Sequence, residues 1–424
     1  MDRWRQLRQN RLLDAGVFFI ALLFVVKIAA VLPSRVYQDD FAYFYLPGKM
    51  LLQGENPYTT SLRTIEKQYG FPSSERIPTA ASPPPLLWLF APVALLEVRT
   101  GFFAWVAVQS ISLCWVFLLT RRLLDAQMSP RVWRLFCAGV LSTQPLFYHF
   151  AYSQVQLIVA LIVLTAFAWH RVGKHTAACL AVTAAGFLKL FPFALLPWFV
   201  WRSRGGIRQK TGRVIVIAVA VAVTIWLTGF GLWDDFMTHG MKVVAAAAID
   251  HTFNCSLPSF VTNLGRLVFS FSVSSATGHV WYRAGMISGL VLLGAGYVMC
   301  LGRVRSQMAE FCLLNAIVLA GDLVCWGHYL IMLIFPTAVA VAWVVKHPSV
   351  RRCVWLCLTL LLLNSVDLVT NPVFSPYPCL RFLANYVPLG GLCMLIIFFV
   401  KESSHADWPA FFAERSESLT NRFR

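Results

Sequence analysis

Long apolar runs recur along the whole chain and alternate with short polar segments. Runs of about 18 to 25 apolar residues are typical of helices that cross a membrane. The pattern predicts an all-α, polytopic membrane protein with roughly twelve passes, including two short arms of a hairpin. The other spans are expected at about 15–32, 101–120, 133–147, 154–169, 214–230, 281–301, 309–324, 329–345, 354–369 and 386–400.

The polar segments between these runs are either basic or close to neutral. The basic ones include MDRWRQLRQNR, RRLLDAQMSPRVWR, HRVGKH, RSRGGIRQKTGR and VKHPSVRR. Cytoplasmic loops carry an excess of Lys and Arg. The alternation therefore predicts that these segments and both chain ends are cytoplasmic. No small-residue cleavage site follows the first run, which we interpret as a retained helix rather than a signal peptide.

Three segments interrupt the alternation of spans within a single domain that covers 1–424. Segment 33–100 is expected to be an outer loop, in which SPPPLLWLFAPVALL forms an interfacial or re-entrant helix. Segment 231–280 is expected to be a second outer loop. Segment 176–201 lies between two basic stretches, so we expect a hairpin whose tip stays in the outer half of the membrane. A rival topology makes 83–96 a span and 176–201 one crossing, but it places two basic loops outside.

Composition supports a membrane protein over a soluble one. The 424 residues are 58% hydrophobic and 13% charged, about half the charge of a typical soluble domain. A net charge of +17 is compatible with nucleic-acid binding, but the basic residues lie in short clusters between apolar runs. We therefore expect no nucleic-acid partner.

The eleven cysteines lie mostly inside apolar runs and form no C-x-x-C pair or metal-ligand spacing. They are typical of small buried hydrophobic residues. Cys255 and Cys379 fall in expected outer loops and could pair, which the sequence does not decide. No metal site is predicted.

The predicted topology brings ionisable residues together at the outer face. Asp39 and Asp40 follow the first span, Lys189 lies at the hairpin tip, and Asp322 and His328 flank another outer junction. An ionisable residue at membrane depth is by default a candidate functional residue. Simpler explanations remain open. Asp39 suits a solvated loop, Lys189 could pair with Asp322, and His328 could be an ordinary residue at a helix end.

Several motifs resemble, in order, those of the GT-C glycosyltransferases of glycosyltransferase family eighty-seven. DDFAYFYLPGKMLLQGENPY resembles the family's first outer loop, and ASPPPLLWLFAPVALL resembles its Pro-Pro helix. SQVQLIVALIVL is similar to a Gly-Gln-x-Asn segment, and GFLKLFPFALL to a Lys-x-x-Pro hairpin. NCSLPSFVTNLGRL and CWGHYLIMLIFP are similar to the later Asn-x-Ser-Leu and Trp-x-His motifs. Tyr329 stands where the family often has a second His. Ser153 and Gln156 replace the Gly and the Asn of the Gly-Gln-x-Asn segment.

The resemblance implies a GT-C bundle that transfers mannose or arabinofuranose from a polyprenyl-phosphate donor, with inversion, to a glycolipid, polysaccharide or protein. Asp40 would be the general base, and His328 would orient substrate or contact the phosphate. The donor phosphate would meet Lys189 or Arg266. Further substrate contacts are expected from Asp39, Tyr43, Gln154, Gln156, Asn254, Ser256 and Trp326. For Asn254 and Ser256, a helix cap is an equally good explanation because Pro258 suits a first turn.

No cofactor is expected, although Asp39 could serve as a ligand for a divalent metal instead of tuning Asp40. The resemblance also implies the plasma membrane of a bacterium, membrane lipids as surroundings, and a site that faces the periplasm or exterior. A polytopic lipid or solute transporter is the alternative. Transporters usually carry internal repeats, and this sequence shows none. A non-catalytic scaffold would not require Asp40 and His328 to share a cavity.

Overall fold

The computed structural model describes residues 2–37, 39–71, 79–124, 127–250, 253–270, 275–304, 306–372, 376–405 and 408. These residues form helices and connecting turns, with one isolated β-bridge between Asn254 and Trp326. The first half contains α1 (Asp2–Arg35), α2 (Asp39–Leu52), α3 (Arg63–Glu66), η1 (Lys67–Tyr69), α4 (Pro84–Ala94), α5 (Val98–Leu124), α6 (Pro130–Leu141), α7 (Gln144–Ala151), α8 (Gln156–Arg171), α9 (His175–Leu188), η3 (Phe191–Leu195) and α10 (Leu196–Trp201).

The second half begins with a long apolar helix and returns repeatedly to the bundle. It contains α11 (Ile207–Thr228), α12 (Phe230–Asp235), η4 (Phe236–Gly240), α13 (Met241–Asp250), α14 (Leu257–Phe269), α15 (Ala276–Gly302), α16 (Gln307–Gly321), η5 (Gly327–Leu333), α17 (Ile334–Lys346), α18 (Val350–Leu363), η6 (Val366–Thr370) and α19 (Pro378–Glu402).

The prediction of an all-helical, multi-pass membrane protein is confirmed for the described residues. Six helices are long and apolar enough to cross a membrane, at Asp14–Arg35, Val98–Leu124, Ile207–Thr228, Ala276–Gly302, Gly327–Lys346 and Pro378–Glu402. A seventh results if Gln144–Ala151 and Gln156–Arg171, which are bent by 117°, form one broken span.

The expected count of roughly twelve passes is not confirmed. Expected span 133–147 is divided between α6 and α7, which begins at a Gln-Pro pair after Thr143. Expected spans 309–324 and 354–369 correspond to helices of 15 and 14 residues. Hydropathy finds apolar runs, but it does not locate the Pro residues and polar junctions at which such a run bends or stops.

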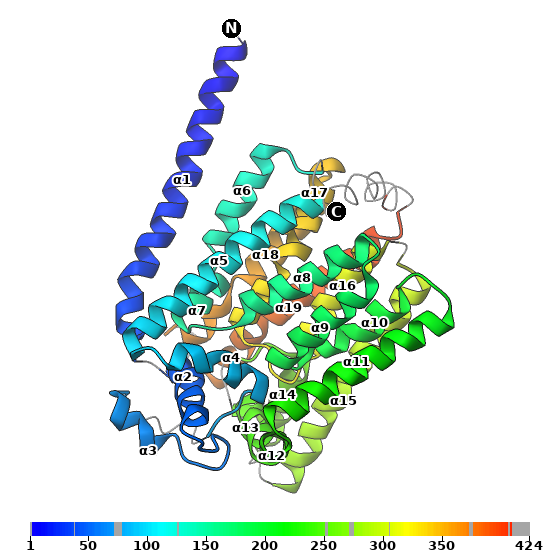
Figure 1. Ribbon diagram of the computed structural model, residues 1–424. Helices are drawn as coiled ribbons and strands as arrows, with labels where there is room; N and C mark the ends of the chain where they lie inside the picture. Colours follow the sequence, from blue (N-terminus) through cyan, green and yellow to red (C-terminus); the bar gives the residue numbers. More distant parts are fainter. Residues whose placement is uncertain are drawn as a thin grey trace.

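Figure 1 shows α1 projecting well beyond the other helices, while α2, α3, α4, α12 and α13 gather at one end of the bundle. Helices α2 and α4 pack closely there. Gly48 permits this contact, because a Cβ atom at that position would lie 3.2 Å from the Phe90 carbonyl carbon. The close approach fixes α2, which carries Asp40, against the Pro-led helix α4.

Two buried glutamates join helices near the basic segments. Glu310 accepts hydrogen bonds from Trp198 Nε1 at 2.8 Å and Arg202 Nε at 2.7 Å. Glu402 accepts from Trp343 Nε1 and from Arg352 Nε, both at 2.9 Å. A buried carboxylate requires such partners, because an unpaired buried charge is strongly destabilising.

Candidate active site

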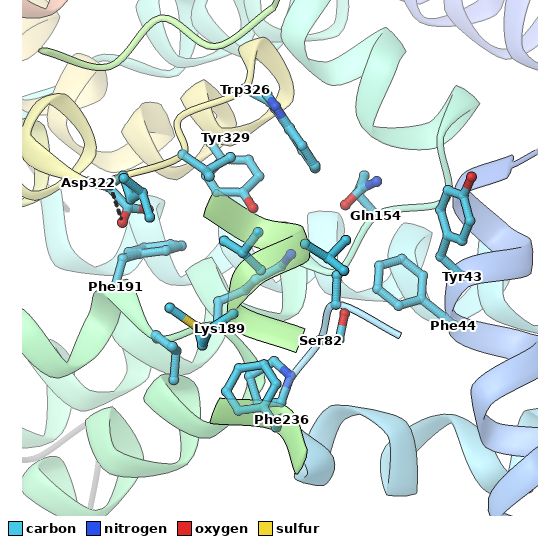
Figure 2. A pocket seen from close by; sticks show the side chains of 18 of the residues that line it. Tyr43, Phe44, Ser82, Gln154, Lys189, Phe191, Phe236, Asp322, Trp326 and Tyr329 are labelled. Atoms are coloured by element: carbon cyan, nitrogen blue, oxygen red, sulfur yellow. Dashed lines mark hydrogen bonds between the residues drawn. The ribbon is translucent and has the colours of Figure 1, made fainter. Parts of the chain in front are cut away.

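A cavity of about 160 Å³ lies where α2, the hairpin after α9 and the segment after α16 meet. Space of this size holds on the order of ten water molecules. Figure 2 shows the side chains around it. The lining residues are Asp40, Tyr43, Phe44, Ala81, Ser82, Pro83, Gln154, Lys189, Leu190, Phe191, Phe236, Met241, Val243, Val244, Asp322, Leu323, Val324, Trp326 and Tyr329.

Helix α2 supplies Asp40, Tyr43 and Phe44 to this cavity. These positions are three and four residues apart, so they share one helix face. Phe41 and Tyr45 do not line the cavity and are buried in the hydrophobic core, to which Phe44 also belongs. The division of α2 into a core face and a cavity face gives Asp40 a partly exposed position.

Lys189 lies at a break in the hairpin. Helix α9 ends at Leu188, and Lys189 is extended, with φ −145° and ψ 134°. The chain continues into η3, with Pro192 in its first turn, and α10 packs back against α9. This break falls where the sequence places the hairpin tip. Figure 2 shows the Lys189 side chain in the middle of the cavity, with its Nζ 5.5 Å from the centre of the Tyr329 ring.

Asp322 provides a second carboxylate in the same cavity. It follows the last residue of α16, and its Oδ1 accepts a hydrogen bond from Leu323 N at 2.8 Å. Gly289 of α15 lies so close to Gly321 that a Cβ atom there would clash with the Gly321 carbonyl oxygen. This close approach of α15 fixes the end of α16 and therefore the position of Asp322.

Burial and mutual attraction act in opposite directions on these two charges, both of which lie outside the candidate spans. Burial lowers the pKa of Lys189 to about 8, although the carboxylates of Asp322 and Asp40 favour the cation. Burial raises the pKa of Asp322 to about 7, although the Leu323 N–H and Lys189 favour the anion. Burial thus disfavours the charged form of both groups, and their mutual attraction favours it.

Gln154 lies in the sharp turn between α7 and α8. Ser153 adopts a positive φ of 50°, and its carbonyl oxygen accepts a hydrogen bond from Trp105 Nε1 at 2.9 Å. Gln154 is buried, and its Oε1 has no hydrogen-bond partner in the structure. Figure 2 shows the oxygen of Gln154 directed toward the cavity. Gln154 Oε1 is therefore a buried hydrogen-bond acceptor without a partner at the edge of the cavity.

Asn254 and Ser256 lie behind the cavity wall rather than on it. Asn254 Oδ1 accepts from Cys325 N at 2.9 Å, and its Nδ2 donates to Leu323 O at 3.0 Å. Ser256 caps α14 by accepting from Ser259 N, and its hydroxyl also donates to Leu323 O. Both side chains thus hold the segment that carries Leu323, Val324 and Trp326.

The other expected site residues lie outside the lining. His328 is buried beside it, with its ring 5.6 Å from Trp326 and 6.2 Å from Tyr152. Gln156 is buried at the start of α8. Arg266 is exposed on α14, so its side chain is not part of the cavity. The Asp39 side chain lies outside the described residues.

Most of the apolar lining residues lie outside the candidate site residues predicted from sequence. Phe191 follows Lys189 and Leu190, and Phe236, Met241, Val243 and Val244 come from the predicted outer loop 231–280. The hairpin motif contains Phe191, so this residue could be identified from the sequence. Segment 236–244 contains no such motif, because only the fold brings it beside α2.

Among the described residues, no group of three or more His, Cys, Asp or Glu side chains could hold a metal ion. The carboxylates of Asp40 and Asp322 instead act on Lys189, because both of them favour its cationic form.

The fold and the cavity define a multi-pass membrane protein with an ionisable, partly apolar pocket at one end of its bundle. The model of glycosyltransferase family 87 matches residues 82–325, more than half of the chain. The protein therefore belongs to glycosyltransferase family 87 and is a glycosyltransferase. Comparisons with curated proteins and with solved structures gave no match.

The matched residues include the hairpin and the segment up to Cys325. Lys189, Gln154, Asn254 and Asp322 therefore lie within them. Asp40, Tyr43 and Trp326 lie outside the match but line the same cavity.

Proposed function

We propose that the protein transfers mannose or arabinofuranose from a polyprenyl-phosphate donor to a hydroxyl group, with inversion at the anomeric carbon. The observation that carries this proposal is the shared cavity of Lys189 and Asp40. Such a transfer needs a cation for the leaving phosphate and a base for the attacking hydroxyl. The cavity offers both.

The apolar part of the cavity supports a lipid-linked donor. Phe44, Leu190, Phe191, Val243 and Val244 line it together with the charged residues. A polyprenyl chain requires an apolar surface, whereas its phosphate requires a cation. Leu190 directly follows Lys189 in the chain, so an apolar side chain and the cation lie side by side in the lining.

In the proposed reaction, Asp40 accepts the proton of the acceptor hydroxyl as its oxygen attacks the anomeric carbon. The bond from that carbon to the phosphate oxygen breaks, and polyprenyl phosphate leaves with the electron pair. Lys189 stabilises the growing negative charge of the phosphate, which is effective in a site with little water. Trp326 and Gln154 would contact the sugar, and His328 would support Trp326 from behind.

We place this reaction at the outer face of a bacterial plasma membrane, with basic loops such as the one around Arg204 in the cytoplasm. The acceptor would be a glycolipid, a polysaccharide or a protein. The proposed steps involve side chains of this chain and no cofactor.

The test is transfer of labelled sugar by the purified protein in lipid vesicles. Polyprenyl-phosphate mannose and polyprenyl-phosphate arabinofuranose are supplied separately, with a membrane extract as acceptor source. Transfer from one donor and not from the matching nucleotide sugar is expected. Absence of transfer from both lipid-linked donors, together with uptake of a solute into the vesicles, would favour a transporter.

A further inference from the structure

The thiols of Cys255 and Cys325 meet directly behind the cavity wall. Their Sγ atoms are 3.8 Å apart, and both residues are buried. The Cys255 thiol also donates to the Cys325 carbonyl oxygen at 3.0 Å. Cys379, which the sequence offered as a partner for Cys255, is exposed at the start of α19.

The backbone places the two cysteines opposite one another. Asn254 and Trp326 form an antiparallel bridge, so Cys255 and Cys325 are the next pair in register. The Cys255 N–H donates to the Cys325 carbonyl oxygen at 2.8 Å. Residues directly opposite in an antiparallel pair have Cα atoms about 4.5–5.5 Å apart. A disulfide requires about 4.4–6.8 Å, so the two sulfur atoms can join by side-chain rotation.

We propose that Cys255 and Cys325 form a disulfide that covalently closes the back wall of the cavity. Two S–H bonds break and one S–S bond forms. The two protons and two electrons pass to a disulfide-bearing thiol oxidoreductase, whose disulfide is reduced to two thiols. The inference rests on the outward orientation in the proposed function, because disulfides form and persist outside the cytoplasm.

This bond would act on the residues that line the cavity. Four residues within three positions of Cys325 line the cavity, namely Asp322, Leu323, Val324 and Trp326. Cys255 immediately precedes Ser256, the N-cap of α14. The disulfide would therefore tie this wall to the start of α14, alongside the hydrogen bonds of Asn254.

The first test maps the bond without measuring activity. Membranes are denatured in N-ethylmaleimide, and the protein is digested without reductant and examined by mass spectrometry. We expect one linked peptide that contains Cys255 and Cys325 and that separates on reduction. Cys179 and Cys312, which are also buried, serve as controls and should carry the maleimide label. Complete labelling of Cys255 and Cys325 before reduction would overturn the proposal.

A second measurement compares wild type with the Cys255→Ser/Cys325→Ser variant. A phosphine reductant should lower the thermal unfolding temperature of the purified wild-type protein by roughly 5 °C and leave the variant unchanged. Equal shifts in both proteins would contradict a disulfide at this position. A linked peptide in a protein that transfers no sugar would refute the proposed function and leave the disulfide standing.

Discussion

Lys189 and Asp322 occupy matching positions at the edge of one cavity. Each residue directly follows the last residue of a helix, and the backbone of each is extended. The C-terminus of a helix carries a partial negative charge. The end of α9 therefore favours the Lys189 cation, whereas the end of α16 disfavours the Asp322 anion. Both helix ends thus add partial negative charge at the cavity, so an anion that binds there depends on the charge of Lys189.

Donor binding should depend on pH through Lys189. Burial lowers the pKa of Lys189 to about 8, so the cation is lost as pH rises through that value. The affinity for a polyprenyl-phosphate sugar should fall by about tenfold for each pH unit well above this value. Titration of a fluorescent polyprenyl-phosphate analogue over a pH series measures this.

The matched variant for the pH series is Lys189→Arg. An arginine stays protonated over this range, so its donor affinity should not fall above pH 8, even if its overall affinity is lower. A wild-type affinity that is constant across the series would show that another group holds the phosphate.

Removal of the Lys189 charge should weaken donor binding at neutral pH. Lys189→Met keeps most of the side-chain volume but removes an interaction with a charged group, which corresponds to about a ten- to hundredfold loss of affinity. Lys49→Met is the control. Lys49 is also partly buried near α4, where it donates to Ala94 O at 3.0 Å, but it does not line the cavity. Similar donor affinities in the two variants would remove Lys189 from the phosphate role.

Much of the candidate site was accessible from sequence, because its residues lie in short motifs with chemical character. Asp40, Tyr43, Gln154, Lys189 and Trp326 were all proposed from such motifs, and all line one cavity. Their roles stay predictions. The motifs indicate which residues carry charge or hydrogen-bonding groups, and the outer-face topology indicated that they could meet.

The supporting role of Asn254 could not be found in the same way. Its hydrogen-bond partners at Leu323 and Cys325 lie about seventy residues away in the chain, and no local pattern predicts that pairing. Arg266 is the opposite case, in which the residue type was suitable but its place in the fold could not be predicted. Its charge suited a phosphate, but its position on α14 leaves it exposed, because the face of a helix that turns inward depends on tertiary packing.

Asn254 should therefore be required for the cavity wall rather than for chemistry. Asn254→Ala leaves Cys325 N without its acceptor, at a cost of about 1–3 kcal/mol for a buried group left unpaired, and it leaves Leu323 O with the Ser256 hydroxyl as its remaining side-chain donor. Both thermal stability and turnover should fall. Asn364→Ala is the control, since Asn364 Oδ1 accepts from Gln144 N at 2.7 Å but Asn364 does not line the cavity. It should lose stability with turnover retained below its unfolding temperature. Full turnover in folded Asn254→Ala would show that the wall does not depend on this side chain.

The last prediction distinguishes the two carboxylates of the cavity. Asp40→Asn keeps the size of the side chain but removes its ability to accept a proton. If Asp40 is the general base, turnover should fall by about two to four orders of magnitude, while donor affinity changes little. Asp322→Asn removes a negative charge that favours the Lys189 cation. Its donor affinity should therefore fall at a lower pH than in wild type, and its turnover with saturating donor should stay within about tenfold of wild type.

Asp235→Asn is the control for loss of a carboxylate at this end of the bundle. Asp235 accepts from Asn56 Nδ2 at 2.6 Å and does not line the cavity, so its turnover should be close to that of wild type. Turnover is measured with labelled lipid-linked donor, and donor affinity is measured separately with the fluorescent analogue. Near-normal turnover in Asp40→Asn, with a loss of several orders of magnitude in Asp322→Asn, would assign the base to Asp322. That result would also place the attacking hydroxyl on the side of the cavity formed by the end of α16, opposite α2.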